Sequence, residues 1–455
     1  MSLPFLPFEV IISILLLLPA RELIKFLVAC KSWCAKIKSQ DFIKKHLDTS
    51  VATGKSYILY LPSESKAAKT FTLLNHKSFC YEFELRVPFH LPCVLDCIIV
   101  GSVNGLICLT NISCFGHTIY LTNPSINKYL ILPLSSIYRD EFDLRVIQLS
   151  LGFGYHEKTN DFKVVRIGFV EHDQSDEDDY EEATTLDHRY DFESKAEVFS
   201  LNTKVWKTVE LSPNFFYKRH DTFSGVVVNE CLHWKTIKSN IYEEKIVILS
   251  FHMGEETFQE IEYPKFHDEG RIDRSTCIGE FKSKLGLFTF CPVEYWFGPG
   301  EQPCQLWVME EYGDKNSWTC HATIVLGILI HRPLSFTRNG EIVMQDRSGN
   351  TFCYDLTSNQ LLDLNIQDEE HDMNIVDFTD SLVLVDLNDE PMGGEGAFPA
   401  GGHDFDEYML MEQVLNDERI KFQSETSVPI VIAPVSSISR HCGLCLIVTL
   451  APGFN

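Results

Sequence analysis

The sequence lacks an apolar run long enough to cross a membrane as a helix, and its first residues lack the pattern of a signal peptide. Two apolar runs, Val10–Leu18 and Leu444–Leu450, are far shorter than the ~20 residues of a transmembrane helix. Val10–Leu18 is preceded by Glu9 instead of a basic segment, and no small-residue cleavage site follows it. We therefore expect no membrane partner and a location in the cytoplasm, with the nucleus as a second compartment.

The chain has fifteen cysteines but lacks the spacing of a zinc site. The closest pairs are Cys30/Cys34, Cys93/Cys97 and Cys442/Cys445. None of them joins another pair in a two-plus-two pattern. An odd number of scattered cysteines is typical of free, mostly buried thiols in a reducing compartment. The sequence therefore predicts no metal site.

Sequence motifs of catalysis are also missing. The segment GKS at 54–56 lacks the upstream glycine of a phosphate-binding loop, because Thr49 stands in its place. The segment GFG at 152–154 has no third glycine at 157, and neither GxSxG nor HExxH occurs. His233 and Trp234 are more typical of a structural pair at a strand end than of a catalytic pair. We therefore expect no enzyme and no cofactor.

Basic residues are scarce, with 39 Lys/Arg against 64 Asp/Glu and a net charge of −25. Residues 1–50 hold seven Lys/Arg and four Asp/Glu, a net +3, so the remainder carries −28. Such a field repels nucleic acids and anionic membranes and attracts a basic protein. The alternative interpretation, that the charge only keeps the chain soluble, stays open.

The first fifty residues have the periodicity of three short helices. Apolar residues recur at three- and four-residue spacing between Pro7 and Pro19, and proline ends the run because it cannot continue a helix interior. A second helix is expected over about 21–29, and a third from Trp33 towards Leu47. Three helices of this size cannot bury much surface alone. A partner that covers the remaining apolar face is therefore expected.

After residue 50 the pattern changes to short apolar runs with period-two alternation, separated by turn residues. Three units consist of a strand, a polar turn and a second strand: 197–207, 306–318 and 352–360, the first two with a tryptophan at 206 and 318. Many strands at short intervals favour an all-β repeat, a propeller or a sandwich. A propeller of this length would have about six to eight blades.

The N-terminal module resembles the F-box, in its plant form. The residues that carry the resemblance are LPFEV at 6–10, ILLLLPA at 14–20 and VACKSW at 28–33. Leu17 departs from the plant pattern, which usually has arginine there. The resemblance implies docking to a Skp-type adaptor, which links to a cullin and a RING protein of a ubiquitin ligase.

By this resemblance, seven residues would lie at or beneath the adaptor interface. They are Leu6, Pro7, Leu15, Leu18, Pro19, Leu23 and Trp33. The alternative is that each is a core position of the small bundle, and that the two prolines only delimit helices.

The large domain resembles the plant F-box-associated domain over about residues 95–345. The resemblance rests on GSVNGLIC at 101–108, NPS at 123–125, LGFGY at 151–155 and NDFKVVR at 160–166. Together the resemblances imply an F-box at 1–50, a β-propeller-like target-binding domain at 51–385, and an extension of unknown structure at 386–455. The chain would be a non-catalytic subunit that recruits a protein for ubiquitination.

Two local matches, CKSW at 30–33 and DSLVL at 380–384, resemble the S-locus F-box proteins of self-incompatible plants. In that subfamily the target is a ribonuclease taken up by the pollen tube. The pollen tube would then be the cellular location of this chain. Such ribonucleases tend to be basic, which suits an acidic domain. Glu171–Glu182 has eight acidic residues in twelve and is either a solvated loop or an electrostatic lip for that target. The candidate target-facing residues are Asp176, Glu177, Asp178 and Asp179.

Three other functions remain open from the sequence. A glycan-binding F-box adaptor would show exposed Trp or Tyr over a pocket with Asp or Asn nearby. A propeller enzyme would show convergent carboxylates or histidines with shifted pKa values. A Skp-binding protein outside any ligase would share the F-box alone.

Overall fold

The computed structural model describes most of the chain up to residue 385. The described residues are 7–62, 70–87, 97–111, 118–134, 144–172, 191–212, 216–219, 224–239, 244–264, 276–290, 302–368 and 375–385. Residues 386–455 and the acidic residues 176–179 lie outside these ranges. No helix among the described residues combines the length and the apolar character needed to cross a bilayer.

The N-terminal module consists of short helices, as predicted. They are α1 (Phe8–Leu16), α2 (Ala20–Leu23), which continues as the 3-10 helix η1 (Ile24–Val28), α3 (Lys31–Ile37) and α4 (Gln40–Ala52). The prediction of one helix from Trp33 towards Leu47 was wrong. The chain breaks at Ser39, whose backbone is extended and whose hydroxyl accepts a hydrogen bond from the Phe42 amide, so that a new helix begins.

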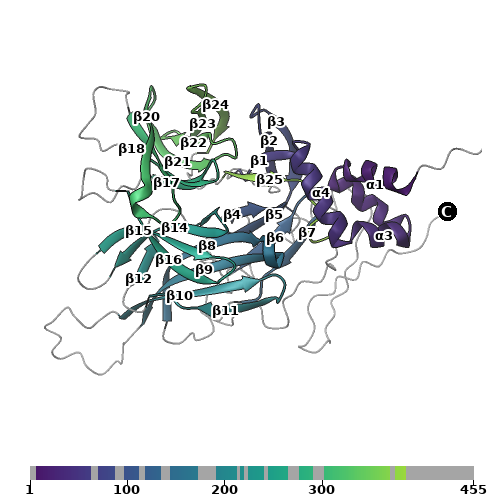
Figure 1. Cartoon of the computed structure of the whole chain (residues 1–455), viewed down its shortest axis with the longest axis horizontal. Coiled ribbons are helices and arrows are strands. Elements are labelled where there is room, and N and C mark those ends of the chain that lie inside the picture. The colour runs from purple at the N-terminus through teal and green to yellow at the C-terminus, as the bar shows by residue number, and fades with distance from the viewer. Residues whose placement is uncertain are drawn as a thin grey trace, which may run out of the picture. The chain divides into compact units, whose positions relative to one another are not determined.

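The large domain is a six-bladed β-propeller, in agreement with the predicted all-β repeat (Figure 1). Within the described residues, its strands form six antiparallel sheets. Blade 1 consists of β25 (Ile375–Thr379), β1 (Ser56–Tyr60), β2 (Thr70–Asn75) and β3 (Tyr81–Arg86). Blade 2 consists of β4 (Cys97–Val103), β5 (Leu106–Asn111), β6 (Ile119–Asn123) and β7 (Lys128–Ile131). Blade 3 consists of β8 (Leu144–His156), β9 (Asp161–His172), β10 (Asp191–Ser200) and β11 (Val205–Val209). Blade 4 consists of β12 (Phe216–Arg219), β13 (Val226–Val228), β14 (Cys231–Ser239), β15 (Glu244–His252) and β16 (Thr257–Glu262). Blade 5 consists of β17 (Thr276–Phe281), β18 (Lys284–Phe290), β19 (Gln302–Met309) and β20 (Trp318–Leu326). Blade 6 consists of β21 (Ile330–Phe336), β22 (Ile342–Asp346), β23 (Asn350–Asp355) and β24 (Gln360–Gln367).

The ring is closed by the last described strand. The strands β25, β4, β8, β13, β17 and β21 contact each other in succession and return to β25, which makes them the inner strand of each blade. Strand β25 pairs with β1, with Ser56 opposite Thr379 and Tyr60 opposite Ile375. The first blade is therefore incomplete until the end of the propeller sequence has been added.

Tryptophans join neighbouring blades. Trp234 is 1% exposed, and its indole N–H donates to the Leu151 carbonyl over 2.8 Å. Trp234 lies within β14 and not at a strand end as predicted, and a Cβ on Gly152 would lie 2.4 Å from its ring. On the outer strands, Trp206 donates to the Pro133 carbonyl and Trp318 to the Glu262 carbonyl of the preceding blade.

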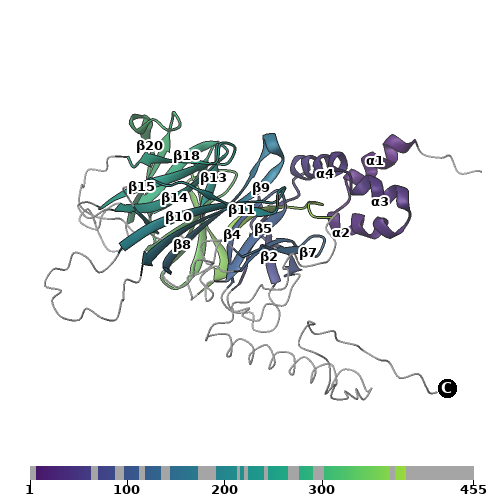
Figure 2. The ribbon, with the colours of Figure 1, turned by 90° about the horizontal axis from the view of Figure 1, so that it is seen from below.

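Two sets of connections lie at opposite ends of the strands. The turns between the first and second strands and between the third and fourth strands share one end, because antiparallel strands alternate in direction. The helical module contacts this end, since the cleft beside α4 is lined by Asn104, Glu157 and Asn202 from three such turns. Figures 1 and 2 show the helices beside the ends of β5 and β7. The predicted domain limits at residues 50 and 385 stay predictions.

Candidate functional site

Helix α1 exposes an apolar stripe. Val10, Ile14 and Leu17, the residue that follows the helix, are spaced at four and three residues and are 41%, 47% and 55% exposed. The adjacent Phe8 is also exposed and stacks on Trp33, with ring centroids 5.8 Å apart. A monomeric soluble protein rarely exposes contiguous apolar side chains unless a partner covers them. Their spacing in the sequence predicts a helix, but the resemblance to the F-box does not place Val10, Ile14 or Leu17 at the interface.

Two of the seven predicted interface residues lie beneath the surface. Leu15 is 5% exposed and Leu23 is fully buried, and both belong to the apolar cluster of the helical module. They can shape an interface only by supporting the helices above them.

The other predicted residues are more accessible. Leu18, Pro19 and Trp33 are half-buried, and Pro7 is exposed just before α1. Leu6 lies outside the described residues. Their assignment to an adaptor interface stays a prediction.

The core of the helical module continues into the propeller. Leu382 and Val385, from the turn after β25, are 0% and 3% exposed and belong to the same cluster as Leu15, Ala20 and Leu23. This turn contains the DSLVL segment at 380–384. In the structure it is a packing surface for the helices.

Polar contacts accompany this packing. The Ala20 amide donates to Oδ2 of Asp380 over 2.8 Å, and Nζ of Lys55 donates to the Leu17 carbonyl over 2.5 Å. Nε2 of the buried His46 lies 2.9 Å from the Leu18 carbonyl and carries the proton that this contact requires. Burial lowers the pKa of His46, although the contact with the Leu18 carbonyl opposes the shift. The neutral imidazole is therefore the form that fits this site.

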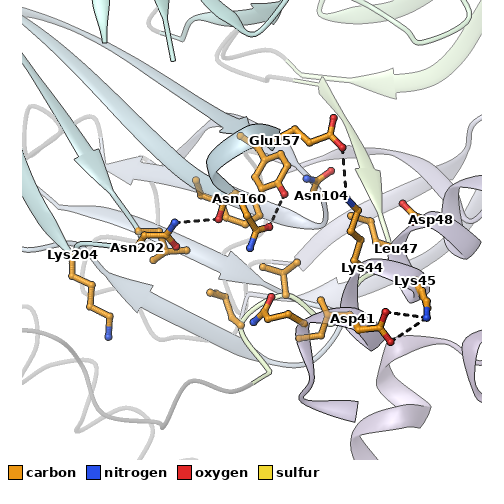
Figure 3. Close-up of a pocket in the computed structure, with 17 residues that line it drawn as sticks. Asp41, Lys44, Lys45, Leu47, Asp48, Asn104, Glu157, Asn160, Asn202 and Lys204 are labelled. Carbon is orange, nitrogen blue, oxygen red and sulfur yellow. Dashed lines mark hydrogen bonds and ion pairs between the residues drawn. The ribbon is translucent and has the colours of Figure 1, made fainter. Parts of the chain in front are cut away.

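A cleft of about 730 Å³ lies between α4 and the turns of blades 2 and 3 (Figure 3). Lys44 on α4 pairs with Glu157 across it over 3.6 Å. The Tyr155 hydroxyl donates to the Asn160 side chain over 2.7 Å, and the side-chain amide of Asn202 donates to the backbone carbonyl of Asn160 over 3.2 Å. These polar groups hold the turns together, and the cleft lies at the junction between the helical module and the propeller.

His233 occupies a structural site between blades 4 and 5. Its Nε2 lies 2.7 Å from the Tyr312 hydroxyl, which lies 3.0 Å from the Ser250 hydroxyl. Burial lowers the pKa of His233 to about 4. Because the ring is 1% exposed, the shift follows from its enclosure and needs no catalytic explanation. The described residues contain no group of three or more His, Cys, Asp or Glu side chains that could hold a metal ion.

Comparison with known proteins gives the chain a clear set of relatives. Residues 57–387 match the F-box associated beta propeller domain, and residues 3–45 match the F-box domain. The chain is 27% identical over 339 residues to the F-box protein At3g07870 of Arabidopsis thaliana, covering 70% of this chain and 72% of the relative. It is 25% identical over 377 residues to the F-box protein CPR1 of the same plant, covering 80% and 85%. It is also 25% identical over 355 residues to the Arabidopsis F-box/kelch-repeat protein At3g23880, covering 76% and 86%.

Proposed function

The chain belongs to the plant F-box proteins that carry an F-box associated β-propeller domain, and from this premise we propose that it is the target-recognition subunit of a Skp–cullin–F-box ubiquitin ligase. An F-box domain implies binding to a Skp-type adaptor, and proteins of this family are typically non-catalytic. The observation that carries the proposal is the exposed stripe of Val10, Ile14 and Leu17 on α1. The adaptor would cover this stripe and link the chain to the cullin and the RING protein.

The contribution of the chain to ubiquitination is proximity. A target held by the propeller meets the ubiquitin-charged enzyme at a high local concentration, which accelerates transfer without a catalytic residue in the propeller. The F-box and the propeller share one apolar cluster, including Leu23 and Leu382. A joint packed in this way limits the range of positions that the target can take.

The proposed target is a basic protein, and within this class a basic S-ribonuclease of the pollen tube. Two features support a basic partner: the net charge of −25, and the eight acidic residues between 173 and 190. The strand ends that flank this segment, His172 of β9 and Asp191 of β10, are paired with each other. They lie at the end of blade 3 opposite the turn with Glu157 that contacts α4.

The described residues favour the alternative of a glycan-binding adaptor less than the ligase function. The cleft in Figure 3 contains a tyrosine and several asparagines, as a lectin site would. However, Tyr155 and Asn202 are already engaged within the turns. A propeller enzyme would show a histidine with a shifted pKa, and burial does lower the pKa of His233. However, His233 is buried between blades 4 and 5 and does not support an enzyme.

The adaptor interface can be tested with two substitutions of equal exposure. Ile14 on α1 is 47% exposed and Val51 near the end of α4 is 50% exposed. We expect Ile14→Asp to abolish co-purification of a recombinant Skp-type adaptor and Val51→Asp to retain it. Equal binding by both variants would contradict the assignment of the α1 stripe.

The target can be sought by affinity purification from pollen and from leaf. A basic ribonuclease recovered only from pollen would support the S-locus interpretation. Recovery of the adaptor without any basic protein from either tissue would contradict the proposed target and leave the ligase role in place. Absence of the adaptor from both would contradict the ligase role.

A further inference from the structure

The helical module does not complete its own core. Its central residues Ala20, Leu23 and Phe42 are fully buried, and the cluster that buries them includes Leu382 and Val385 from the other end of the described chain. A bundle of fewer than fifty residues rarely buries enough apolar surface to be stable alone. Part of the surface that stabilises the F-box is therefore supplied by the turn at 380–385.

The same turn supplies a missing cap. Helix α2 has only four residues, and its N-terminal flanking residue, Pro19, makes no side-chain cap. Asp380, 360 residues later in the chain, accepts the hydrogen bond of the Ala20 amide within the buried junction. A buried N–H without a partner is costly, so the start of α2 depends on this carboxylate.

Closure of the propeller positions the turn. Asp380 follows Thr379, the last residue of β25, which pairs with Ser56 of β1. Gly105 passes so close to the turn that a Cβ there would lie 2.2 Å from Oγ of Ser381. The Asp380 amide also donates to the Lys55 carbonyl over 3.4 Å. Without the β25–β1 pairing, Asp380 and Leu382 would not be held beneath the helices.

From these contacts we propose that adaptor binding is coupled to closure of the propeller. The exposed stripe of α1 rests on Leu15, which packs in the shared cluster, and the last turn of α1 is tied to Lys55 through the Leu17 carbonyl. A chain whose last strand is unpaired lacks this support, so the stripe that it presents to the adaptor is less firmly held. The inference rests on the proposed ligase function and adds an order of assembly. The F-box is synthesised first and gains its full affinity for the adaptor when the target-binding domain is complete.

The coupling can be tested in the full-length chain with one junction residue and a remote control. Asp380→Ala removes the acceptor of the Ala20 amide, and Asp380→Asn keeps an acceptor oxygen. Ile342→Ala opens a cavity in blade 6, where Ile342 is fully buried within a different cluster. The affinity for a recombinant Skp-type adaptor is measured by calorimetry, and near-ultraviolet circular dichroism reports whether the propeller stays folded.

We expect Asp380→Ala to weaken adaptor binding at least tenfold while the propeller signal is retained. Asp380→Asn should lose less, and Ile342→Ala should stay within twofold of the unaltered chain. Unchanged binding by Asp380→Ala would overturn the proposal, and so would an equal loss in Ile342→Ala.

Hydrogen exchange separates this proposal from the proposed function. If the unaltered chain does not bind the adaptor, the proposed ligase function is wrong. Hydrogen exchange of the amides at 8–23 then shows by itself whether the turn at 380–385 stabilises the helices. Faster exchange there in Asp380→Ala than in Ile342→Ala would support the coupling. Identical exchange in the two variants would overturn it.

Discussion

Asn123 and Val383 lie 260 residues apart, and the side-chain amide of Asn123 donates a hydrogen bond to the Val383 carbonyl over 2.9 Å. The same amide nitrogen donates to the Ser381 carbonyl over 3.0 Å. Oδ1 of Asn123 accepts from the Ser125 amide, so the side chain also shapes its own turn. One asparagine thus joins a turn of blade 2 to the segment that follows the closing strand.

Asn123→Asp should destabilise this junction strongly. The aspartate can still accept from the Ser125 amide, but it cannot donate to the carbonyls of Ser381 and Val383, and it places a negative charge at a fully buried site. An unpaired buried polar group and an unpaired buried charge together cost about 3 kcal/mol or more. The free energy of unfolding, measured by urea denaturation, should fall by that amount.

The control for this substitution is Asn127→Asp in the same turn. Asn127 is exposed and has φ of 54°, a conformation that aspartate also tolerates. We expect a change within about 0.5 kcal/mol, as at ordinary surface positions. Similar losses in the two variants would show that the donor function of Asn123 is unimportant.

Gly152→Ala should destabilise the contact between blades 3 and 4. The added Cβ would lie 2.4 Å from the ring of Trp234. That ring cannot move freely, because Trp234 is 1% exposed and its indole N–H is hydrogen-bonded to the Leu151 carbonyl. Overpacking of this kind costs about 1–3 kcal/mol. A lower midpoint of thermal unfolding is the expected result.

Gly327→Ala is the matched control, since a Cβ at Gly327 would meet no atom within 4 Å. Its expected effect is within about 0.5 kcal/mol. A tolerated alanine at 152 would mean that the GFG segment at 152–154 does not pack against Trp234 as described.

The fold could be predicted because local patterns carry it. Period-two alternation located the strand pairs at 197–207, 306–318 and 352–360, and prolines 7 and 19 marked the first helix. The blade count could not be predicted, because the repeats diverge. Blades 3 and 5 have a tryptophan at the start of the outer strand, whereas the equivalent strand of blade 6 starts at Gln360.

The candidate site was only partly predictable, for a physical reason. Motif positions such as Leu15 and Leu23 were found, but a motif does not distinguish the surface of a bundle from its interior, and both residues are buried. The role of 380–385 was hidden because a contact such as that between Ala20 and Asp380 leaves no local periodicity in the sequence.

Cysteine reactivity should follow burial. Among the described residues, the exposed cysteines are Cys30, Cys80 and Cys320, and the buried ones are Cys97, Cys108, Cys231, Cys277, Cys304 and Cys353. Burial raises the pKa of Cys277 to about 12, so its reactive thiolate is scarce at pH 8. Iodoacetamide should modify the exposed cysteines at least ten times faster than the buried ones, as measured by peptide mass spectrometry.

The control for labelling is the same chain in urea, where all these cysteines should react at similar rates. Rapid labelling of Cys277 in the folded chain would contradict its enclosure between blades 5 and 6. It would also contradict the interpretation of these thiols as packing residues.

Stability should fall as the pH drops below about 6.5, through His233. Burial lowers its pKa to about 4 in the folded chain, while the unfolded value is about 6.5. The unfolded state therefore binds the proton more readily, and the stability present above pH 6.5 is lost as the pH falls towards 4. For His233 the loss between pH 7 and pH 5 is about 2 kcal/mol. His46, whose pKa burial also lowers, contributes in the same direction.

His233→Gln should flatten this pH dependence, because glutamine cannot take up a proton, even if the absolute stability falls with the altered contact to Tyr312. His321→Gln on β20 is the control, since His321 is exposed. Urea denaturation of the three chains at pH 7, 6 and 5 gives the slopes. A slope unchanged in His233→Gln would mean that His233 is protonated as easily in the folded chain as in the unfolded one, and therefore that the site beside Tyr312 admits water.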